Sequence, residues 1–131
     1  MQEFNGKRSC DEWMLKAKSD LKSAKKLKND EETWDNSVYL AQQCAEKSFK
    51  AFLDYCNLPI ARTHDLELLV GLCSKIDTHF ELLKQRAAFL KPFSIAFRYP
   101  DDLLFPAEED VIEAIDDAQF IFNFIQQKIK P

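Results

Sequence analysis

Hydrophobic residues recur along most of this chain at the three- and four-residue spacing that places them on one side of an α-helix. The first stripe lies in residues 9–28, with lysines on the opposite side, and Ser9 and Glu12 fit a capping box at its start. After a polar break at residues 29–32, a broader stripe runs to about Tyr55. Its apolar arc covers more than half of the circumference, so we expect this second helix to be the most buried one.

Three further stripes follow in the second half of the chain. Thr63 is expected to cap a third helix, and Gly71 inside that helix suggests close packing, because glycine weakens a helix by about 1 kcal/mol relative to alanine. A fourth helix should run from residue 77 or 78 to about Lys91, and a fifth should start at Pro106, whose ring suits a first helical turn. The pattern therefore predicts an all-α protein, an up-down bundle of four or five helices.

Only two of the 131 residues are glycines, Gly6 and Gly71. Loops that cradle phosphates need several glycines close together so that backbone N–H groups can approach the ligand, so any nucleotide site here has to be built from side chains. A chain of this size buries roughly 68% of its unfolded surface, which supports one core. We therefore expect a single domain over residues 1–131, with residues 1–8 as a disordered tail.

The remaining composition excludes several kinds of site. No apolar run approaches the roughly 20 residues that cross a bilayer, and the N-terminus lacks the hydrophobic core of a signal peptide, so we expect a cytoplasmic protein without membrane contact. The four cysteines include no CxxC pair and have no nearby histidine pair, which favours buried reduced thiols over a zinc site. Neither histidine follows a glutamate by three residues, as di-iron bundles require, and there is no Gly-x-Ser-x-Gly elbow. We expect neither a metal nor a cofactor.

Charge is distributed unevenly along the chain, whose formal net charge is −4. Residues 7–28 contain eight basic and three acidic side chains, whereas residues 99–117 contain eight acidic and no basic ones. Such an asymmetry can steer a partner onto the molecule. The alternative is that both segments are solvated helix faces, and the sequence leaves both interpretations open.

One ion pair can be anticipated between the first two helices. Asp20 lies on the edge of the first apolar stripe, where an unpaired carboxylate is costly after desolvation. Lys47 lies on the edge of the polar strip of the second helix and is the candidate partner. We expect Asp20 and Lys47 to form a partly buried structural pair.

Residues 62–65 form the first of two polar clusters that are candidate binding sites. Arg62 and His64 lie beside the expected N-terminus of the third helix, and exposed N–H groups with an arginine beside them can bind an anion. The alternative is ordinary capping of that helix, with His64 packed on the surface.

The second cluster, residues 98–101, lies in the longest segment without helical periodicity, residues 93–105. Arg98 and Tyr99 can offer a fork of N–H donors and a stacking ring to a nucleotide or an RNA base. The alternative is a salt bridge from Arg98 to Asp101 or to the last helix, which would tie the loop down.

Four segments together resemble the HEPN domain family of small helical domains. They are AKSDLKSA at 17–24, AQQCAEKSFKA at 41–51, THDL at 63–66 with Leu69 after it, and RYPD at 98–101. The resemblance spans roughly residues 11–130 and rests on the order and spacing of the segments. It implies a bundle of four or five helices that is frequently a homodimer. Such proteins are often encoded beside a minimal nucleotidyltransferase, with which they form a complex or a toxin–antitoxin pair.

The resemblance also implies a chemistry, because many HEPN proteins are metal-independent ribonucleases with an Arg-x(4–6)-His motif assembled across a dimer. There the histidine would move a proton and the arginine would stabilise charge on the phosphate. In this chain the motif is incomplete: the positions where the histidine should follow Arg98 hold Leu103, Leu104 and Phe105, and no other arginine has a histidine at that spacing. The acidic residues beyond Arg98 would also repel an RNA or DNA backbone.

We therefore expect a noncatalytic module, not an enzyme, that dimerises and binds a nucleotidyltransferase-like protein or a nucleotide. The residues expected to bind are Arg98, Tyr99, Asp101, Arg62 and His64. One alternative is a metal-independent endoribonuclease with a degenerate motif, in which His64 is the substitute base. Another is a purely structural dimer whose loop arginine makes only salt bridges.

Overall fold

The computed structural model describes residues 8–100 and 104–131, which form five α-helices and three short 3₁₀-helices with no strand among them. The first half comprises α1 (Ser9–Leu27), η2 (Glu31–Thr33) and α2 (Trp34–Tyr55). The second half comprises α3 (Leu66–Ile76), η3 (Thr78–Leu83), α4 (Lys84–Leu90), η4 (Lys91–Ser94) and α5 (Glu108–Lys128). The expected all-α bundle is confirmed. Apart from Arg8, the tail expected over residues 1–8 lies outside the described residues.

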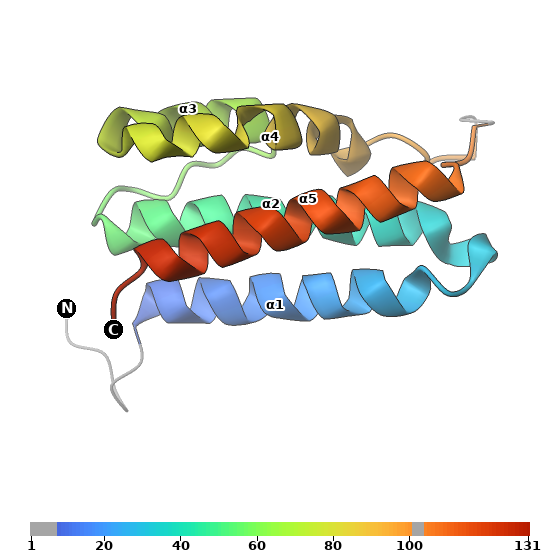
Figure 1. Cartoon of the computed structure of the whole chain (residues 1–131), viewed down its shortest axis with the longest axis horizontal. Coiled ribbons are helices and arrows are strands. Elements are labelled where there is room, and N and C mark those ends of the chain that lie inside the picture. Colours follow the sequence, from blue (N-terminus) through green and yellow to red (C-terminus); the bar gives the residue numbers. More distant parts are fainter. Residues whose placement is uncertain (1–7, 101–103) are drawn as a thin grey trace.

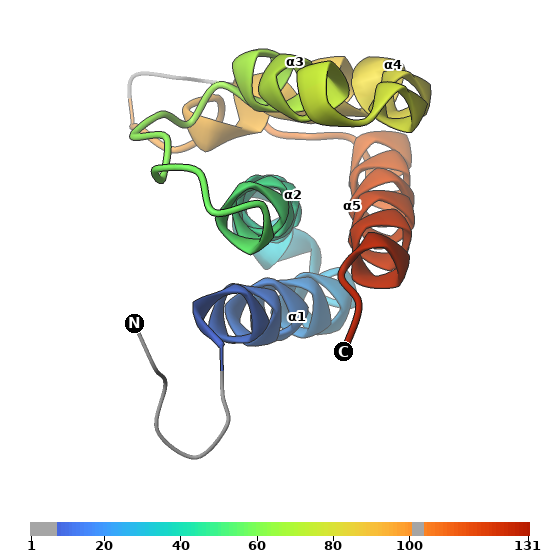
Figure 2. The ribbon, with the colours of Figure 1, turned by 90° about the vertical axis from the view of Figure 1, so that its left-hand side faces the viewer.

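Helix α2 lies at the centre of the bundle. Figure 2 looks along it and shows α1 below, α5 to one side and α3 with α4 above. Thirteen of its 22 residues are buried, against five of 19 in α1, because its broad apolar arc meets several neighbours. Figure 1 shows α1, α2 and α5 lying lengthwise beside one another. None of the helices in the described ranges is both long and apolar enough to span a membrane.

An aromatic cluster closes the core between α2, η3 and α5. The ring of Phe80 in η3 is fully buried. Its centroid lies 4.4 Å from that of Phe52 in α2 and 5.1 Å from that of Phe124 in α5, which it meets edge on. Leu83 is buried as well, and a 3₁₀-helix places residues i and i+3 directly above one another. The single helix expected from residue 77 or 78 is therefore wrong in its first half, and regular α-helix begins only at Lys84.

The capping box predicted at Ser9 and Glu12 is also wrong. Ser9 is already the first helical residue of α1, and its hydroxyl donates to the Asp54 carboxylate of α2. Arg8 precedes the helix and pairs with Asp11 at 3.0 Å. The N-cap position is therefore occupied by Arg8, which makes no side-chain cap hydrogen bond, because the helix begins one residue earlier than a Ser9 cap requires.

At α3 the cap is Asp65 rather than Thr63. The Asp65 carboxylate accepts hydrogen bonds from the amides of Glu67 and Leu68 at 3.0 and 3.3 Å, while Thr63 Oγ1 accepts from the Asp65 amide. Aspartate is the stronger N-cap of the two, so the helix starts at Leu66.

Two further details differ from the sequence-based expectations. A Cβ added to Gly71 would have no heavy atom of a neighbouring element within 4 Å among the described residues, so the close packing expected there is absent. Helix α5 begins at Glu108 rather than at Pro106. Its first turn is closed by Asp110, whose carboxylate accepts from the Ala107 amide at 3.0 Å, and this local bond sets the start of the helix.

Candidate functional site

A buried carboxylate on α2 is the centre of a polar cluster. Glu46 is only 4% exposed, and its Oε2 lies 2.9 Å from Nζ of Lys50, one helical turn further along. His64, in the loop before α3, places Nδ1 3.0 and 3.1 Å from the two carboxylate oxygens. The side-chain amides of Gln42 and Gln43 donate to Oε1 of the same carboxylate at 3.2 and 3.3 Å. These four partners replace the water that Glu46 has lost.

The loop between α2 and α3 is tied to this cluster. It leaves α2 through Asn57, whose φ of 62° lies in the left-handed region that often ends a helix. It then returns along α2, where Gln42 Nε2 donates to the main-chain oxygen of His64 at 3.3 Å. The His64 side chain remains 74% exposed. Its position is therefore held through both the main chain and Nδ1, while the ring faces solvent.

The contact with Glu46 assigns the tautomer of His64. An ionised carboxylate only accepts hydrogen bonds, so Nδ1 carries the proton when the ring is neutral and Nε2 is the acceptor on the far side. Burial opposes the ionisation of Glu46, but hydrogen bonds from Lys50 and His64 outweigh burial and hold the pKa of Glu46 below its usual value. The cluster thus combines an anion, an ammonium group and an imidazole with an accessible nitrogen.

Arg98 lies against the first half of the same helix. Its guanidinium carbon is 4.0 Å from the centre of the Tyr39 ring, and Nη1 donates to the main-chain oxygen of Ser94 at 3.2 Å. The preceding residue, Phe97, has a φ of 69°, which is uncommon for an aromatic residue. Its ring stacks on Phe93 with the centroids 6.0 Å apart. This turn places Arg98 over Tyr39.

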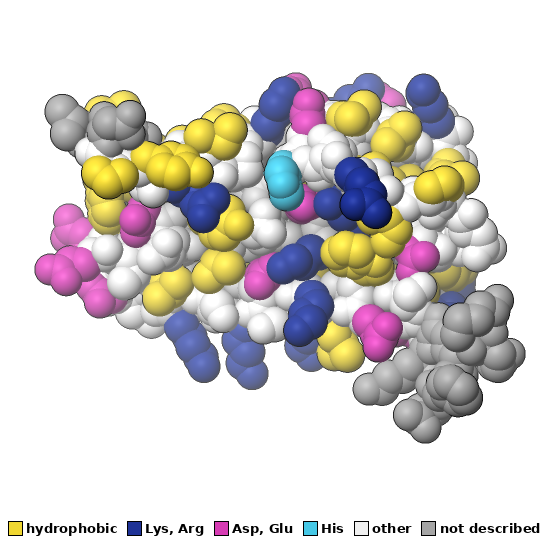
Figure 3. Space-filling model, turned by 180° about the vertical axis from the view of Figure 1, so that it is seen from behind, with side chains coloured by type: hydrophobic (Ala, Val, Ile, Leu, Met, Phe, Trp, Pro, Cys, Tyr) yellow, Lys and Arg dark blue, Asp and Glu magenta, His cyan; other side chains and the backbone are white. Residues whose placement is uncertain are grey.

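Arg98 and His64 approach the same side of α2. Tyr39 and Glu46, which they contact, are seven residues apart in α2, which is two helical turns and about 10 Å along the axis. Figure 3 shows the back of the molecule, where a histidine lies with Lys and Arg side chains beside it. We refer to Tyr39, Glu46, Lys50, His64 and Arg98 as the α2 polar face.

The helix N-terminus beside Arg62 is partly occupied by the chain itself. Asp65 takes two amides of the first turn of α3, and Lys91 Nζ lies 3.4 Å from Asp65 and 3.1 Å from Glu67. Arg62 is exposed. Ordinary capping therefore describes the main chain at this point, while the ring of His64 turns to Glu46.

The remaining predicted binding residues lie around Arg98. Tyr99 is 58% exposed, and Asp101 lies outside the described residues. The α5 carboxylate that pairs with an arginine in the described structure belongs to Asp117, and it reaches Arg86 at 2.7 Å rather than Arg98. The Arg98 guanidinium is thus oriented by Tyr39 and the Ser94 main chain, and not by a salt bridge to α5.

Sequence reasoning does not single out Tyr39, Glu46 or Lys50. The i, i+4 spacing of Glu46 and Lys50 is typical of an ion pair along one side of a helix. This spacing is the feature of the sequence from which the Glu46–Lys50 pair could have been predicted. The return of the loop over α2 has no periodic pattern, so nothing in the sequence brings His64 to them.

The pair Asp20 and Lys47 joins α1 to α2. Lys47 Nζ lies 2.6 Å from Asp20 Oδ2, and the two side chains are 25% and 16% exposed. Both side chains therefore lose most of their water at the boundary between the two helices.

The cysteines are free thiols. Cys10, Cys44 and Cys73 are buried and Cys56 is half-buried. Burial raises the pKa of Cys44 to about 12 and also raises that of Cys73, which makes both poor nucleophiles. Within the residues that the structure describes, no group of three or more His, Cys, Asp and Glu side chains could hold a metal ion.

Comparison with known proteins places this architecture in a family. No curated protein matches the chain. The crystal structure of ST0689, an archaeal HEPN homologue, is 27% identical with a TM-score of 0.70, and the match covers 95% of this chain and 99% of that one. The crystal structure of TT1696 from Thermus thermophilus is also 27% identical, with a TM-score of 0.78 over 91% of this chain and 97% of that one. The family model for the HEPN domain matches residues 10–129, and the chain therefore belongs to the HEPN domain family.

Proposed function

We propose that this HEPN chain is a noncatalytic module that dimerises and binds a nucleotide on the α2 polar face. The observation that carries the proposal is Arg98 held 4.0 Å over Tyr39. A guanidinium fixed in this way presents N–H donors to a phosphate without first losing side-chain freedom. The same group can stack on a base, as arginines do in single-stranded nucleic-acid sites.

The charges on the α2 polar face favour a phosphate near Arg98 rather than near Glu46. Lys50 is compensated by Glu46, so with a neutral His64 the cluster has no net charge. Among the described residues, neither Arg98 nor the exposed Arg62 takes part in an ion pair. These two arginines supply the positive potential that a phosphate requires.

His64 supplies the second point of recognition. Its Nε2 accepts a hydrogen bond, which suits a sugar hydroxyl or the amino group of a base. The residues that Arg98 and His64 contact, Tyr39 and Glu46, are about 10 Å apart along the axis of α2, so a ligand that uses both side chains has to carry its phosphate and its donor group at opposite ends. A mononucleotide has this arrangement, with the phosphate at one end and the base at the other.

The protein partner in this proposal is a nucleotidyltransferase-like protein, because the resemblance that led to the HEPN family implies one. A toxin–antitoxin pair is the setting that it implies. Co-purification of the chain with the product of the neighbouring gene tests this part. If the two proteins elute separately, the proposed protein partner is wrong, and the proposed nucleotide site is unaffected.

Isothermal titration with ATP, GTP and UTP tests the nucleotide site. We expect binding of at least one nucleotide, weakened at least about tenfold by Arg98→Ala, because a charge-assisted hydrogen bond contributes about 1.5–3 kcal/mol. Lys75→Ala removes an exposed cation from α3 and is the matched control, with unchanged affinity. Absence of binding for all three nucleotides, or equal affinity of Arg98→Ala, contradicts the proposal.

A second candidate function is a metal-independent endoribonuclease, and one observation favours it. His64 is oriented by Glu46 through Nδ1, which is the arrangement that prepares Nε2 to take a proton from a hydroxyl. Single-turnover cleavage of a labelled RNA by wild type, His64→Gln and Arg98→Ala separates the two functions. Cleavage lost in both variants supports the ribonuclease, and an RNA that stays intact with wild type supports the noncatalytic module.

A further inference from the structure

The hydrogen bonds around Glu46 all run toward its carboxylate. Gln43 Nε2 donates to Gln42 Oε1 at 2.8 Å and to Glu46 Oε1 at 3.3 Å. Gln42 Nε2 donates in turn to Glu46 Oε1 and to the main-chain oxygen of His64. A reversed Gln42 amide would place its oxygen against these two acceptors, so the neighbours determine its orientation. Lys50 donates to the other carboxylate oxygen at 2.9 Å. Glu46 is therefore an acceptor for each of these partners.

The solvent side of the His64 ring is an acceptor for the same reason. Because Nδ1 donates to the ionised carboxylate of Glu46, the neutral ring has no proton left for Nε2. The side chain is 74% exposed, so a ligand can reach it. Glu46 is thus a positioning residue, which decides the nitrogen of His64 that carries the proton.

A fixed acceptor distinguishes ligand groups that can only donate from groups that can only accept. Adenine and cytosine carry an exocyclic amino group, which donates, where guanine and thymine carry an oxo group, which accepts. A ribose hydroxyl both donates and accepts, so either tautomer of a histidine can bind it. The tautomer of His64 therefore matters for the base of a nucleotide and not for its sugar.

We propose that Glu46, by holding the proton of His64 on Nδ1, makes the α2 polar face select bases with an amino group over bases with an oxo group in its place. This inference rests on the nucleotide site of the proposed function and names its substrate class, the adenine and cytosine nucleotides. Arg98 binds the phosphate of either class and so contributes affinity without selecting the base. At His64 an oxo group would set one acceptor against another.

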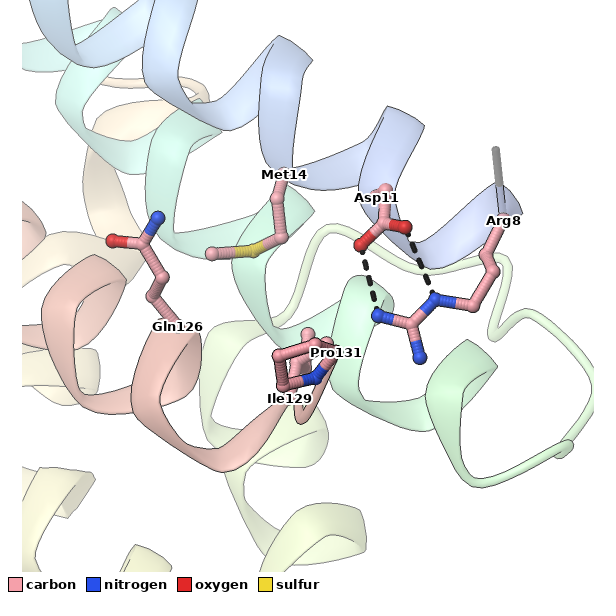
Figure 4. Close-up of a pocket in the computed structure, with 6 residues that line it drawn as sticks. All are labelled: Arg8, Asp11, Met14, Gln126, Ile129 and Pro131. Carbon is pink, nitrogen blue, oxygen red and sulfur yellow. Dashed lines mark hydrogen bonds and ion pairs between the residues drawn. The ribbon is translucent and has the colours of Figure 1, made fainter. Parts of the chain in front are cut away.

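A hollow of about 350 Å³ between α1 and α5 is another place where a base can be tested for. Figure 4 shows Gln126 of α5 and Met14 of α1 at this hollow, beside the ion pair of Arg8 and Asp11. The amide of Gln126 offers both a donor and an acceptor, so it can bind an amino or an oxo group. A base in this hollow would show no preference between the two groups, so the preference distinguishes the two places.

Isothermal titration with ATP, ITP and purine riboside triphosphate tests the selectivity. The three carry an amino group, an oxo group and a hydrogen at the same position of the purine. ITP replaces GTP because guanine has a second amino group, and the third nucleotide controls for the ring N–H that accompanies the oxo group. Wild type should bind ATP about fivefold more tightly than either of the others, the net value of one hydrogen bond.

Glu46→Gln should abolish this preference. The new amide can donate to Nδ1, which allows the proton of His64 to move to Nε2, so ITP should bind at least as tightly as ATP. Glu12→Gln makes the same substitution at an exposed position of α1 and should keep the wild-type preference. Gln126→Ala should keep it as well, because it alters only the α1–α5 hollow.

Nitrogen NMR tests the tautomer without a substitution at the site. Long-range correlations between ring protons and ring nitrogens distinguish a proton on Nδ1 from one on Nε2. The chain has two histidines, so His79→Gln identifies the signals of His64. At about pH 8, where histidine rings are neutral, the proton of His64 should be on Nδ1. A proton on Nε2 would overturn the proposal, whether or not Glu46→Gln folds.

The titrations separate this inference from the proposed function. Equal affinity of wild type for the three nucleotides overturns the selectivity and leaves the nucleotide site in place. The same holds for an unchanged preference in a Glu46→Gln variant that circular dichroism shows to be folded. Weaker binding of every nucleotide by Gln126→Ala would place the base in the α1–α5 hollow and overturn the role of His64. Absence of binding for all three contradicts the proposed function, and this inference with it.

Discussion

His64 reaches the buried carboxylate of Glu46 across 18 positions of sequence, and its Nδ1 lies 3.0 Å from Oε1. The contact joins the loop after α2 to the most buried helix of the bundle. It also places Nδ1 against an ion pair that is shielded from solvent and leaves Nε2 on the far side of the exposed ring. Substitutions at Glu46 should therefore affect stability and loop position together.

Glu46 should make stability depend on pH in the acid range. Burial alone would raise its pKa, but hydrogen bonds from Lys50 and His64 bring the pKa below its usual value. A carboxylate with a lowered folded pKa stabilises the protein above its unfolded pKa, about 4.3 for glutamate, and this is lost as pH falls through the folded value. Urea unfolding of Glu46→Gln should therefore change less between about pH 5 and about pH 3 than that of wild type.

The exposed Glu12 offers the control for this experiment. Glu12→Gln removes a carboxylate from the same chain without touching the cluster, so its stability should follow the wild-type pH dependence. An acid slope that is the same in Glu46→Gln and wild type would show that the folded state does not stabilise the ionised form of Glu46.

The Asp20–Lys47 pair should contribute more than an exposed ion pair does. Removal of one partner leaves a charge at a boundary where the two side chains are only 16% and 25% exposed. We expect Asp20→Ala or Lys47→Ala to lower the free energy of unfolding by about 3 kcal/mol, compared with about 0–1 kcal/mol for a surface pair. A double-mutant cycle by urea denaturation measures the coupling, with Arg8 and Asp11 as the exposed comparison. Negligible coupling between Asp20 and Lys47 would rule the pairing out.

Arg86 should be needed to keep a charge inside the bundle. Burial raises the pKa of Asp117, and the ion pair with Arg86 at 2.7 Å opposes that rise. Arg86→Met should lower stability by about 3–5 kcal/mol near neutral pH, because the carboxylate is left buried without a partner. The loss should shrink as the pH falls into the acid range, because protonation of Asp117, whose pKa burial raises, removes the charge. Lys84→Met, which breaks the exposed pair with Glu81, should cost less than about 1 kcal/mol in thermal unfolding at either pH.

Gly71 should be replaceable. An added Cβ meets no neighbouring element of the described structure within 4 Å, and alanine is the stronger helix former. Gly71→Ala should raise the free energy of unfolding by about 1 kcal/mol in urea denaturation. A lower stability would mean that a side chain does not fit between α3 and its neighbours.

The fold can be predicted from the sequence because the apolar periodicity determines which side of each helix is buried. Asp20 and Lys47 could be paired for the same reason, since both lie at the edges of regular stripes that face one another. The helix starts were harder to predict, because α1 begins one residue earlier than a Ser9 cap requires and Asp65 rather than Thr63 caps α3. The candidate site was the hardest part to predict, because it depends on a loop that returns to Glu46 and has no periodic pattern in its sequence.

The cation–π contact of Lys50 gives the candidate site an optical reporter. Lys50 Nζ lies 6.0 Å from the centre of the Trp13 ring on α1, so the ammonium that compensates Glu46 also stands beside a fluorophore. The other tryptophan, Trp34, donates its indole N–H to the Lys28 main chain at the opposite end of α2. In a Trp34→Phe background, the emission of Trp13 should therefore respond to a change at Lys50, such as the loss of its ion pair when Glu46 takes up a proton.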